Sequence, residues 1–217
     1  MKITSTNIAK PTTIVWNGKK TKTGIYKTPT NAPIYLEKET VKSDEVSDRN
    51  VHGGIYKACY LFSENQYDYW KKLYPHLDWN YGMFGENLTV KNLDETKLFI
   101  GDIYKIGEAL VQVTQPREPC FKLGLRFGSQ EVIQQFINYG FPGIYVRVLQ
   151  EGFVQTGNSL KCMEHDKSSI SIYDFFQLLY SKTKNLQHLK AVHNHKALPQ
   201  KKRALLNRFI KNHIKQD

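Results

Sequence analysis

The sequence predicts a mainly β fold, in which a β-barrel with peripheral helices is followed by a small C-terminal domain of three helices. Short strand-like segments recur through the first 160 of the 217 residues, and such spacing is typical of a barrel or sandwich. A polar stretch then leads into residues with helical patterning. We therefore expect a barrel domain over residues 1–163, a linker over residues 164–170 and a helical extension over residues 171–217.

Eight segments of the first part are expected as strands: residues 23–27, 34–37, 58–62, 87–90, 103–106, 110–114, 144–149 and 152–156. Two helices interrupt them. The first is opened by Ser63 with Gln66 as a capping box and stops at Pro75. The second runs from about Ser129 to Gly140, with one apolar stripe formed by Val132, Ile133, Phe136 and Ile137.

The helical extension holds three short amphipathic segments. Ser171 and Asp174 form an N-cap pair before the first. The second carries Leu186, Leu189 and Val192, and the third follows Pro199 with its apolar side at Leu205, Leu206, Phe209 and Ile210. About fifty residues in three helices close a bundle only if they also pack on the barrel or on a partner.

The formal net charge of +11 lies mostly in this extension. From Lys182 onward there are ten Lys or Arg and one acid, or +9, whereas the first 181 residues hold 21 basic and 19 acidic residues, or +2. A solvated helix face explains the excess better than a nucleic-acid surface. A nucleic-acid-binding module stays open as an alternative, although no specific nucleic-acid partner is expected.

Cysteine usage and the chain's apolar runs limit the classes further. The three cysteines, Cys59, Cys120 and Cys162, lack the number and spacing of a disulfide framework or a cysteine-built zinc site. No run reaches the length of a membrane span, and the first residues do not form a signal peptide. We expect a cytoplasmic protein without a membrane partner.

Four segments carry residue types suited to a binding site. They are Asp48-Arg49-Asn50-Val51-His52-Gly53-Gly54 followed by Lys57, Met83-Phe84-Gly85-Glu86-Asn87-Leu88-Thr89, Gln115-Pro116-Arg117-Glu118-Pro119-Cys120-Phe121-Lys122-Leu123-Gly124, and Gly140-Phe141-Pro142-Gly143-Ile144-Tyr145-Val146-Arg147. Paired glycines allow close approach of a ligand to the backbone. Three cations, Arg117, Lys122 and Arg126, favour the thiolate of Cys120, which is both a nucleophile and a soft metal ligand. From these residues alone the thiol is a nucleophile, a redox sensor or a ligand.

In these segments the sequence resembles the MOSC family, named for the C-terminal part of molybdenum cofactor sulfurase, and most strongly its YiiM-like branch. The matching motifs occur in the family's order and include His52-Gly53-Gly54, Phe84-Gly85-Glu86-Asn87, Gly101-Asp102 and Pro116-Arg117 through Cys120 to Gly124. The helices after Ser168 resemble that branch's three-helix extension. One departure is that Ser43-Asp44-Glu45-Val46-Ser47-Asp48 lacks the Gly-Asp step usual before the first motif.

The resemblance implies a MOSC-type β-barrel that binds the molybdenum cofactor in its molybdopterin form, with Cys120 as catalytic residue and molybdenum ligand. The implied cofactor-binding residues are His52, Gly53, Gly54, Lys57, Asn87, Arg117, Lys122, Arg126 and Arg147. Asp48 would orient the first loop. Pyridoxal phosphate is not expected.

The implied activity is a molybdenum-dependent oxidoreductase that reduces N-hydroxylated compounds to amines, as in detoxification of hydroxylaminopurine base analogues. The chain has no flavin, nicotinamide or iron–sulfur motif, so electrons would come from a separate, flavin-based reductase. The alternative is a carrier of molybdenum cofactor or persulfide sulfur that turns over no substrate.

Overall fold

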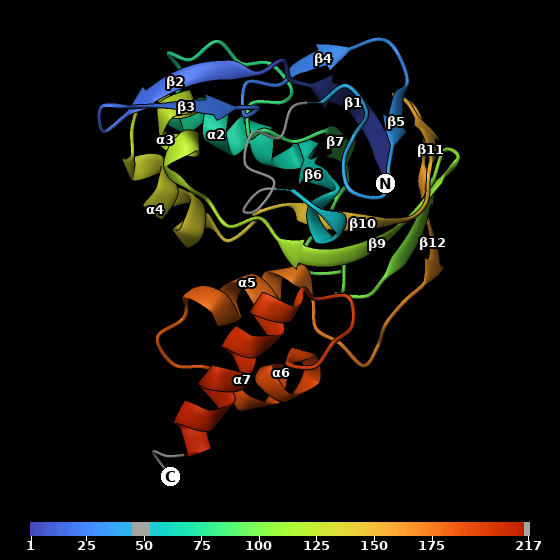
Figure 1. Cartoon of the computed structure of the whole chain (residues 1–217), viewed down its shortest axis with the longest axis vertical. Helices are drawn as coiled ribbons and strands as arrows, with labels where there is room; N and C mark the ends of the chain where they lie inside the picture. Colours follow the sequence, from blue (N-terminus) through green and yellow to red (C-terminus); the bar gives the residue numbers. More distant parts are fainter. Residues whose placement is uncertain (45–52, 215–217) are drawn as a thin grey trace.

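One large mixed sheet forms the body of the protein, and helices cover its flank and its lower side (Figure 1). The structure is a computed structural model that describes residues 1–44 and 53–214. The order of the eight strands is β12-β8-β9-β10-β6-β7-β1-β4, and every neighbouring pair is antiparallel except β6 and β7. The strands are β1 Lys2–Ile8, β4 Thr28–Thr30, β6 Cys59–Ser63, β7 Leu88–Lys91, β8 Ile103–Ile106, β9 Ala109–Pro116, β10 Ile144–Gln150 and β12 Leu160–Glu164.

The mainly β class is confirmed, but the described sheet is not a closed barrel. Its β1 side meets residues 157–160, at the start of β12, through three backbone hydrogen bonds: from Ile3 N to Asn158 O at 2.9 Å, from Gly157 N to Ile3 O at 2.9 Å and from Leu160 N to Met1 O at 3.1 Å. Only one isolated bridge, between Lys2 and Ser159, accompanies them. Because the chain turns just before β12, with Gly157 at φ +92°, no regular ladder forms there.

Two separate two-stranded antiparallel sheets complete the described β structure. β2 (Thr12–Trp16) pairs with β3 (Lys19–Thr23), and β5 (Ile34–Leu36) pairs with β11 (Gly152–Val154). Seven of the eight predicted strands are confirmed, and the one at residues 23–27 is wrong. That segment leaves β3 at Thr23 and buries the charged side chain of Lys27 in an ion pair with Asp44 instead of joining a ladder.

Helices follow the two predicted positions in the first part. A 3₁₀ turn, η2 (Glu64–Gln66), leads into α2 (Tyr67–Leu73), and α4 (Glu131–Tyr139) ends at Gly140 in the left-handed conformation with φ 83°. The capping box is wrong, because the Ser63 hydroxyl donates to Leu93 O at 2.8 Å and makes no cap bond. Sequence reasoning missed η1 (Ile55–Lys57) and α3 (Phe121–Phe127).

An aromatic cluster joins α2, α3 and α4 to the sheet. Phe62 of β6 stacks on Phe84 with ring centroids 4.1 Å apart, and Trp70 lies edge-on to both Phe84 and Phe127. All four side chains are buried. Such rings supply large apolar area with defined geometry, so the cluster fixes the position of α3 directly after Cys120.

The extension consists of α5 (Ile172–Tyr180), α6 (Leu186–Val192) and α7 (Gln200–Ile214), which lie below β9 (Figure 1). The Ser171 cap is confirmed, since its hydroxyl accepts from Asp174 N at 3.0 Å. One apolar cluster runs from sheet residues such as Val111 to helix residues such as Phe175, so the helices pack on the sheet as the sequence argument required. The domain limits at residues 163 and 171 stay a prediction.

Hydrogen bonds attach the expected linker, residues 164–170, both to the sheet domain and to the helical extension. Asp102, fully buried, accepts from Phe99 N and Asp166 N and contacts His165 Nδ1, all at 2.9 Å. Asp166 in turn lies 2.9 Å from His195 Nε2 in the extension. Asp102 therefore fastens residues 165–166 between the sheet and the helices.

Candidate functional site

Cys120 lies at the point where the chain leaves β9 and enters α3. Its backbone is extended, at φ −137° and ψ 172°, and occupies the N-cap position of α3. Leu123 N donates to Cys120 O at 2.9 Å, which starts the helix. Cys120 is half-buried, whereas Cys59 is buried and Cys162 is exposed. The thiol therefore sits on fixed backbone and in partial contact with solvent.

Arg117 supplies a buried cation three residues before this thiol. It is 6% exposed, and its guanidinium carbon lies 5.2 Å from the ring centroid of Phe136 and 5.7 Å from that of Tyr60. Its Nη1 has no hydrogen-bond partner among the described residues. A buried donor of this kind is normally satisfied, so the site fits a ligand that offers an acceptor or an anion. Gln115 Nε2 is also buried and likewise has no hydrogen-bond partner among the described residues.

Lys57 and Tyr145 belong to the same charged neighbourhood. Lys57 Nζ lies 5.5 Å from the ring centroid of Tyr145. Burial lowers the pKa of Lys57, the negative charges of Glu118 and Cys120 oppose this, and Lys202 adds to it. Burial also raises the pKa of Tyr145 to about 12; the positive charge of Arg117 opposes this rise, and the negative charges of Cys120 and Glu118 add to it. These shared effects place the side chains around one site.

The extension contributes to this site, which sequence reasoning missed. Lys202 Nζ of α7 donates to Glu118 Oε1 at 2.6 Å. Tyr180 of α5 interacts electrostatically with the same charged groups. Burial raises the pKa of Tyr180, the negative charge of Glu118 adds to the rise, and the positive charge of Arg117 opposes it. Lys202 stands in the run Lys201-Lys202-Arg203, which looks like an ordinary solvated face. The ion pair with Glu118 in the folded structure distinguishes Lys202 from these neighbours.

The three remaining predicted cations lie on α3 (Lys122 and Arg126) and on β10 (Arg147). Lys122 is buried in α3, and Arg126 on the next turn stacks over Tyr26 at 5.0 Å, with its Nε lacking a partner among the described residues. Burial lowers the pKa of Arg126, against Tyr26 and Glu86. Arg147 donates from Nε to Gln112 Oε1 at 2.7 Å. Their contacts with a cofactor stay predictions.

Asn87 has a structural function in the described contacts. Its Oδ1 accepts from Tyr60 N at 3.2 Å, and its Nδ2 donates to Asp44 Oδ2 at 2.8 Å. Asp44 also accepts from Ala9 N at 2.7 Å and pairs with the buried Lys27. Asn87 therefore holds the residue just before segment 45–52. Its predicted contact with a pterin stays a prediction.

Glu86, in the same motif, is fully buried. Its Oε1 accepts from Gly82 N at 2.9 Å and from Thr89 Oγ1 at 2.8 Å, and Tyr67 also donates to it. Its Oε2 accepts from Phe84 N at 3.1 Å. The glutamate thus shapes the loop before β7 and has its acceptors occupied by the protein.

The first motif is only partly visible. His52 and Asp48 lie outside the described residues. Gly54 has φ +83°, a conformation that L side chains rarely adopt, and Lys57 N donates to Gly54 O at 2.8 Å. Gly54 therefore turns the chain into η1, which carries Lys57.

The donor set fits an anionic cofactor with a soft metal better than a protein-built metal centre. Within residues 1–44 and 53–214 no group of three or more His, Cys, Asp or Glu is arranged to hold a metal ion. One thiol with several cations and unsatisfied buried donors suits a metal that arrives bound to an anionic organic group.

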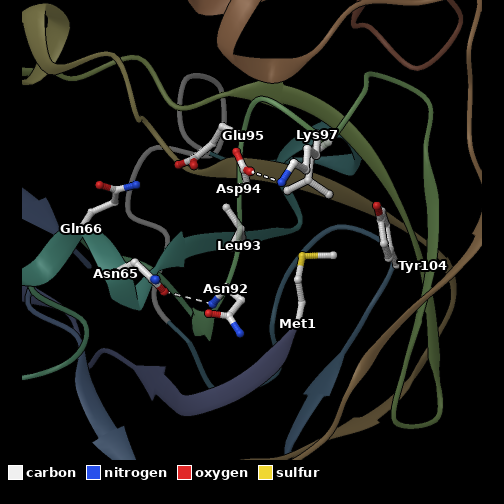
Figure 2. A pocket seen from close by; sticks show the side chains of 10 residues that line it. Met1, Asn65, Gln66, Asn92, Leu93, Asp94, Glu95, Lys97 and Tyr104 are labelled. Carbon is white, nitrogen blue, oxygen red and sulfur yellow. Dashed lines mark hydrogen bonds and ion pairs between the residues drawn. The ribbon is translucent and has the colours of Figure 1, made fainter.

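A separate pocket of about 470 Å³ lies beside the segment from Asn92 to Leu98. None of its lining residues belongs to the four motifs (Figure 2). One of them, Glu95, is fully buried, and its Oε1 accepts from Gly143 N at 3.0 Å. Burial raises the pKa of Glu95 to about 7, and backbone hydrogen bonds oppose the rise. Among the described contacts, the hydrogen bond from Gly143 N to Glu95 thus links the pocket to the fourth motif.

Within the described chain, no helix has the length and apolar character needed to cross a membrane.

A relative and a solved structure resemble the chain over most of its length. The model of the MOSC domain matches residues 48–161. The chain is 36% identical over 202 residues to the uncharacterized protein YflK of Bacillus subtilis, covering 93% of this chain and 91% of that protein. It is 29% identical over 175 residues to a protein named reductase from Gibberella moniliformis, covering 79% of this chain but 31% of the relative. The crystal structure of YiiM from Geobacillus stearothermophilus superposes with a TM-score of 0.81 at 31% identity, covering 96% of this chain and 98% of that one.

Proposed function

The chain belongs to the MOSC family and has YiiM proteins among its relatives, and from that premise we propose that it is a molybdenum-cofactor-dependent reductase of N-hydroxylated compounds. Hydroxylaminopurine base analogues represent the substrate class, and the products are amines. The observation that carries the proposal is the half-buried Cys120 thiol, three residues from the buried, unsatisfied guanidinium of Arg117. The relative named a reductase supports the class of reaction.

The residues around Cys120 have the chemistry to hold this cofactor. The thiolate of Cys120 would be the protein ligand to molybdenum, because thiolates suit soft metals. Arg117 Nη1 and Gln115 Nε2 would donate to acceptors of the pterin or its phosphate, since both are buried without partners among the described residues. When bound, the cofactor supplies the two-electron reduction that cleaves the N–O bond.

Reduction of an N-hydroxyl compound to an amine and water consumes two protons as well as two electrons. Lys57 Nζ would hold one of these protons, because burial lowers the pKa of Lys57 toward the range in which it can give the proton up. Tyr145, whose pKa is about 12, would stay protonated and orient the substrate through its hydroxyl. The helices of the extension and the aromatic cluster would limit the access of water.

The electrons would come from a separate reductase, with a flavin-based donor as the expected kind. The chain carries no motif for flavin, nicotinamide or an iron–sulfur cluster.

The test is turnover by purified protein loaded with molybdenum cofactor and supplied with a chemical reductant, measured as loss of a hydroxylaminopurine. We expect Cys120→Ala to lower kcat by at least about 100-fold, because even residues that only support a metal ligand are worth 10–100-fold. Cys162→Ala, at the exposed thiol of β12, is the matched control. Undiminished turnover in Cys120→Ala refutes the proposal, and a persulfide on Cys120 without turnover would favour a carrier.

A further inference from the structure

We propose that Lys202 of α7 is a positioning residue for the site: through its ion pair with Glu118, the helical extension fixes the loop that leads into Cys120 and, with it, the placement of the thiol. The inference deepens the proposed function, because it names the contact that keeps the thiol ready for its ligand. It rests on that function for the identity of the ligand, whereas the fixing of the loop is a property of this chain.

The loop at residues 117–120 joins β9 to α3 and carries Cys120 at its end. Pro119 and Pro116, the last residue of β9, have no backbone N–H to donate. The proline at 119 also disfavours helical backbone at Glu118. Because few backbone hydrogen bonds are open to such a loop, its restraint depends on side-chain contacts.

Lys202 makes such a contact from the extension. Its Nζ donates to Glu118 Oε1 at 2.6 Å, although 84 residues separate the two along the chain. The Lys202 side chain is only 11% exposed, whereas the neighbouring Lys201 is exposed. Water screens an exposed ion pair, and ordering a mobile lysine costs conformational entropy. Because packing already confines Lys202, its ion pair restrains Glu118 more strongly than a surface pair would.

The extension gives Lys202 a fixed base below β9 (Figure 1). Lys202 lies in the first turn of α7, where its backbone N donates to Pro199 O at 3.0 Å. Just before this turn, Leu198 is fully buried, and His195 Nε2 lies 2.9 Å from Asp166 Oδ2 in the segment that is bound to the sheet. The start of α7 is thus held to the sheet, and Lys202 transmits that position to the loop.

The restrained residue is a close neighbour of the thiol. Glu118 precedes Cys120 by two residues. The amino group of Lys57 interacts electrostatically with Glu118, Lys202 and Cys120, and the hydroxyl of Tyr180 in α5 interacts with Glu118. The extension therefore meets the loop beside the thiol through two helices, α5 and α7.

The placement of a ligating thiol matters because a metal site tolerates little movement of its ligands. Residues that orient a ligand are worth about 10–100-fold in metal affinity or activity, and a productive site needs its groups held within about 0.5 Å. Lys202 acts in this way on Cys120, through Glu118. Loss of the ion pair therefore keeps the thiol but loosens its placement.

The first experiment measures amide hydrogen exchange in the protein without cofactor, in a peptide that spans residues 117–127 and in one that spans β10. Lys202→Met keeps most of the apolar stem and removes the ammonium group. We expect this variant to exchange on the order of 5-fold faster in the loop peptide and to leave the β10 peptide unchanged. Lys201→Met removes the same charge from the adjacent exposed position and should match wild type. Equal acceleration in both peptides, or none in the loop peptide, overturns the inference.

A charge swap assigns the effect to the ion pair. Lys202→Glu and Glu118→Lys each place like charges opposite each other and should speed exchange in the loop peptide. The double variant restores opposite charges and should return the exchange rate toward that of wild type. If the double variant exchanges as fast as the single variants, the ion pair does not fix the loop and the inference is overturned.

The second experiment links the loop to the site, in protein loaded with molybdenum cofactor. The molybdenum that stays with the protein is measured over time after dilution. We expect release about 10-fold faster from Lys202→Met than from wild type or Lys201→Met, with Lys202→Arg close to wild type. An unchanged release rate would show that Lys202 only fastens α7 to the loop, and it overturns the inference even where turnover upholds the proposed function. If wild type takes up no cofactor, the proposed function fails, and exchange in the loop peptide decides for or against Lys202.

Discussion

Replacing Glu95 with glutamine should remove a pH dependence from the stability of the protein. Glu95 is fully buried; its Oε1 accepts from Gly143 N, and its Oε2 has no partner among the described residues. Burial raises the pKa of Glu95 to about 7 from the ordinary 4.5. Between these two values the folded protein keeps a proton that the unfolded chain has lost, so stability falls as the pH rises through this window.

The magnitude follows from the difference between the two pKa values. At 1.36 kcal/mol per pH unit it amounts to about 3 kcal/mol in total, of which about 2.5 kcal/mol falls between pH 5 and pH 8. Glutamine keeps an oxygen that accepts from Gly143 N but does not titrate. Other buried carboxyls, such as Glu86, are present in both proteins and cancel in the comparison.

The assay is urea unfolding of wild type and Glu95→Gln at pH 5 and pH 8, with Glu164→Gln at an exposed carboxylate as the control. We expect wild type to lose about 2.5 kcal/mol more than Glu95→Gln between the two pH values, and Glu164→Gln to behave as wild type. Equal pH dependence in wild type and Glu95→Gln would refute the argument that burial of this carboxyl penalises its charge.

Two further predictions concern the backbone and a helix end. Gly143→Ala should destabilise the protein by more than about 1–3 kcal/mol, because φ is +69° and the new Cβ would lie 2.4 Å from Leu61 O. Urea unfolding checks this against Gly128→Ala, where φ is +73° and the space around the new Cβ is open. Equal losses of stability in the two variants would contradict the clash. Ser171→Ala should cost about 1 kcal/mol by removing the cap on Asp174 N, and an unchanged urea midpoint would show that the cap contributes nothing.

The sequence predicts the strands whose side chains alternate locally, and it misses β1 for a physical reason. β1 reads Lys-Ile-Thr-Ser-Thr-Asn-Ile, and three of its four buried residues, Ser5, Thr6 and Asn7, are polar, the fourth being Ile3. They are satisfied by contacts with partners such as Thr89 Oγ1, which lies 3.1 Å from Asn7 Nδ2. A hydrophobic pattern does not reveal a strand whose buried side chains are mostly polar and hydrogen-bonded.

The candidate site is predictable only where one segment carries it. Arg117 and Cys120 lie three residues apart, so their proximity follows from the sequence. Helix α3 was missed because Pro119 and Gly124 read as loop residues, yet Gly124 lies inside the helix, close to the Gln130 side chain. Lys202 enters the site from a distant helix through one ion pair, and no local pattern encodes such a contact.

The central claim is that Cys120 holds a molybdenum cofactor. The most direct measurement is the molybdenum and pterin content of protein purified from a host that makes the cofactor, for wild type, Cys120→Ala and Cys162→Ala. We expect molybdenum and pterin in equal amounts in wild type and Cys162→Ala, with molybdenum strongly reduced in Cys120→Ala. Absence of both from wild type, or undiminished molybdenum in Cys120→Ala, would contradict it.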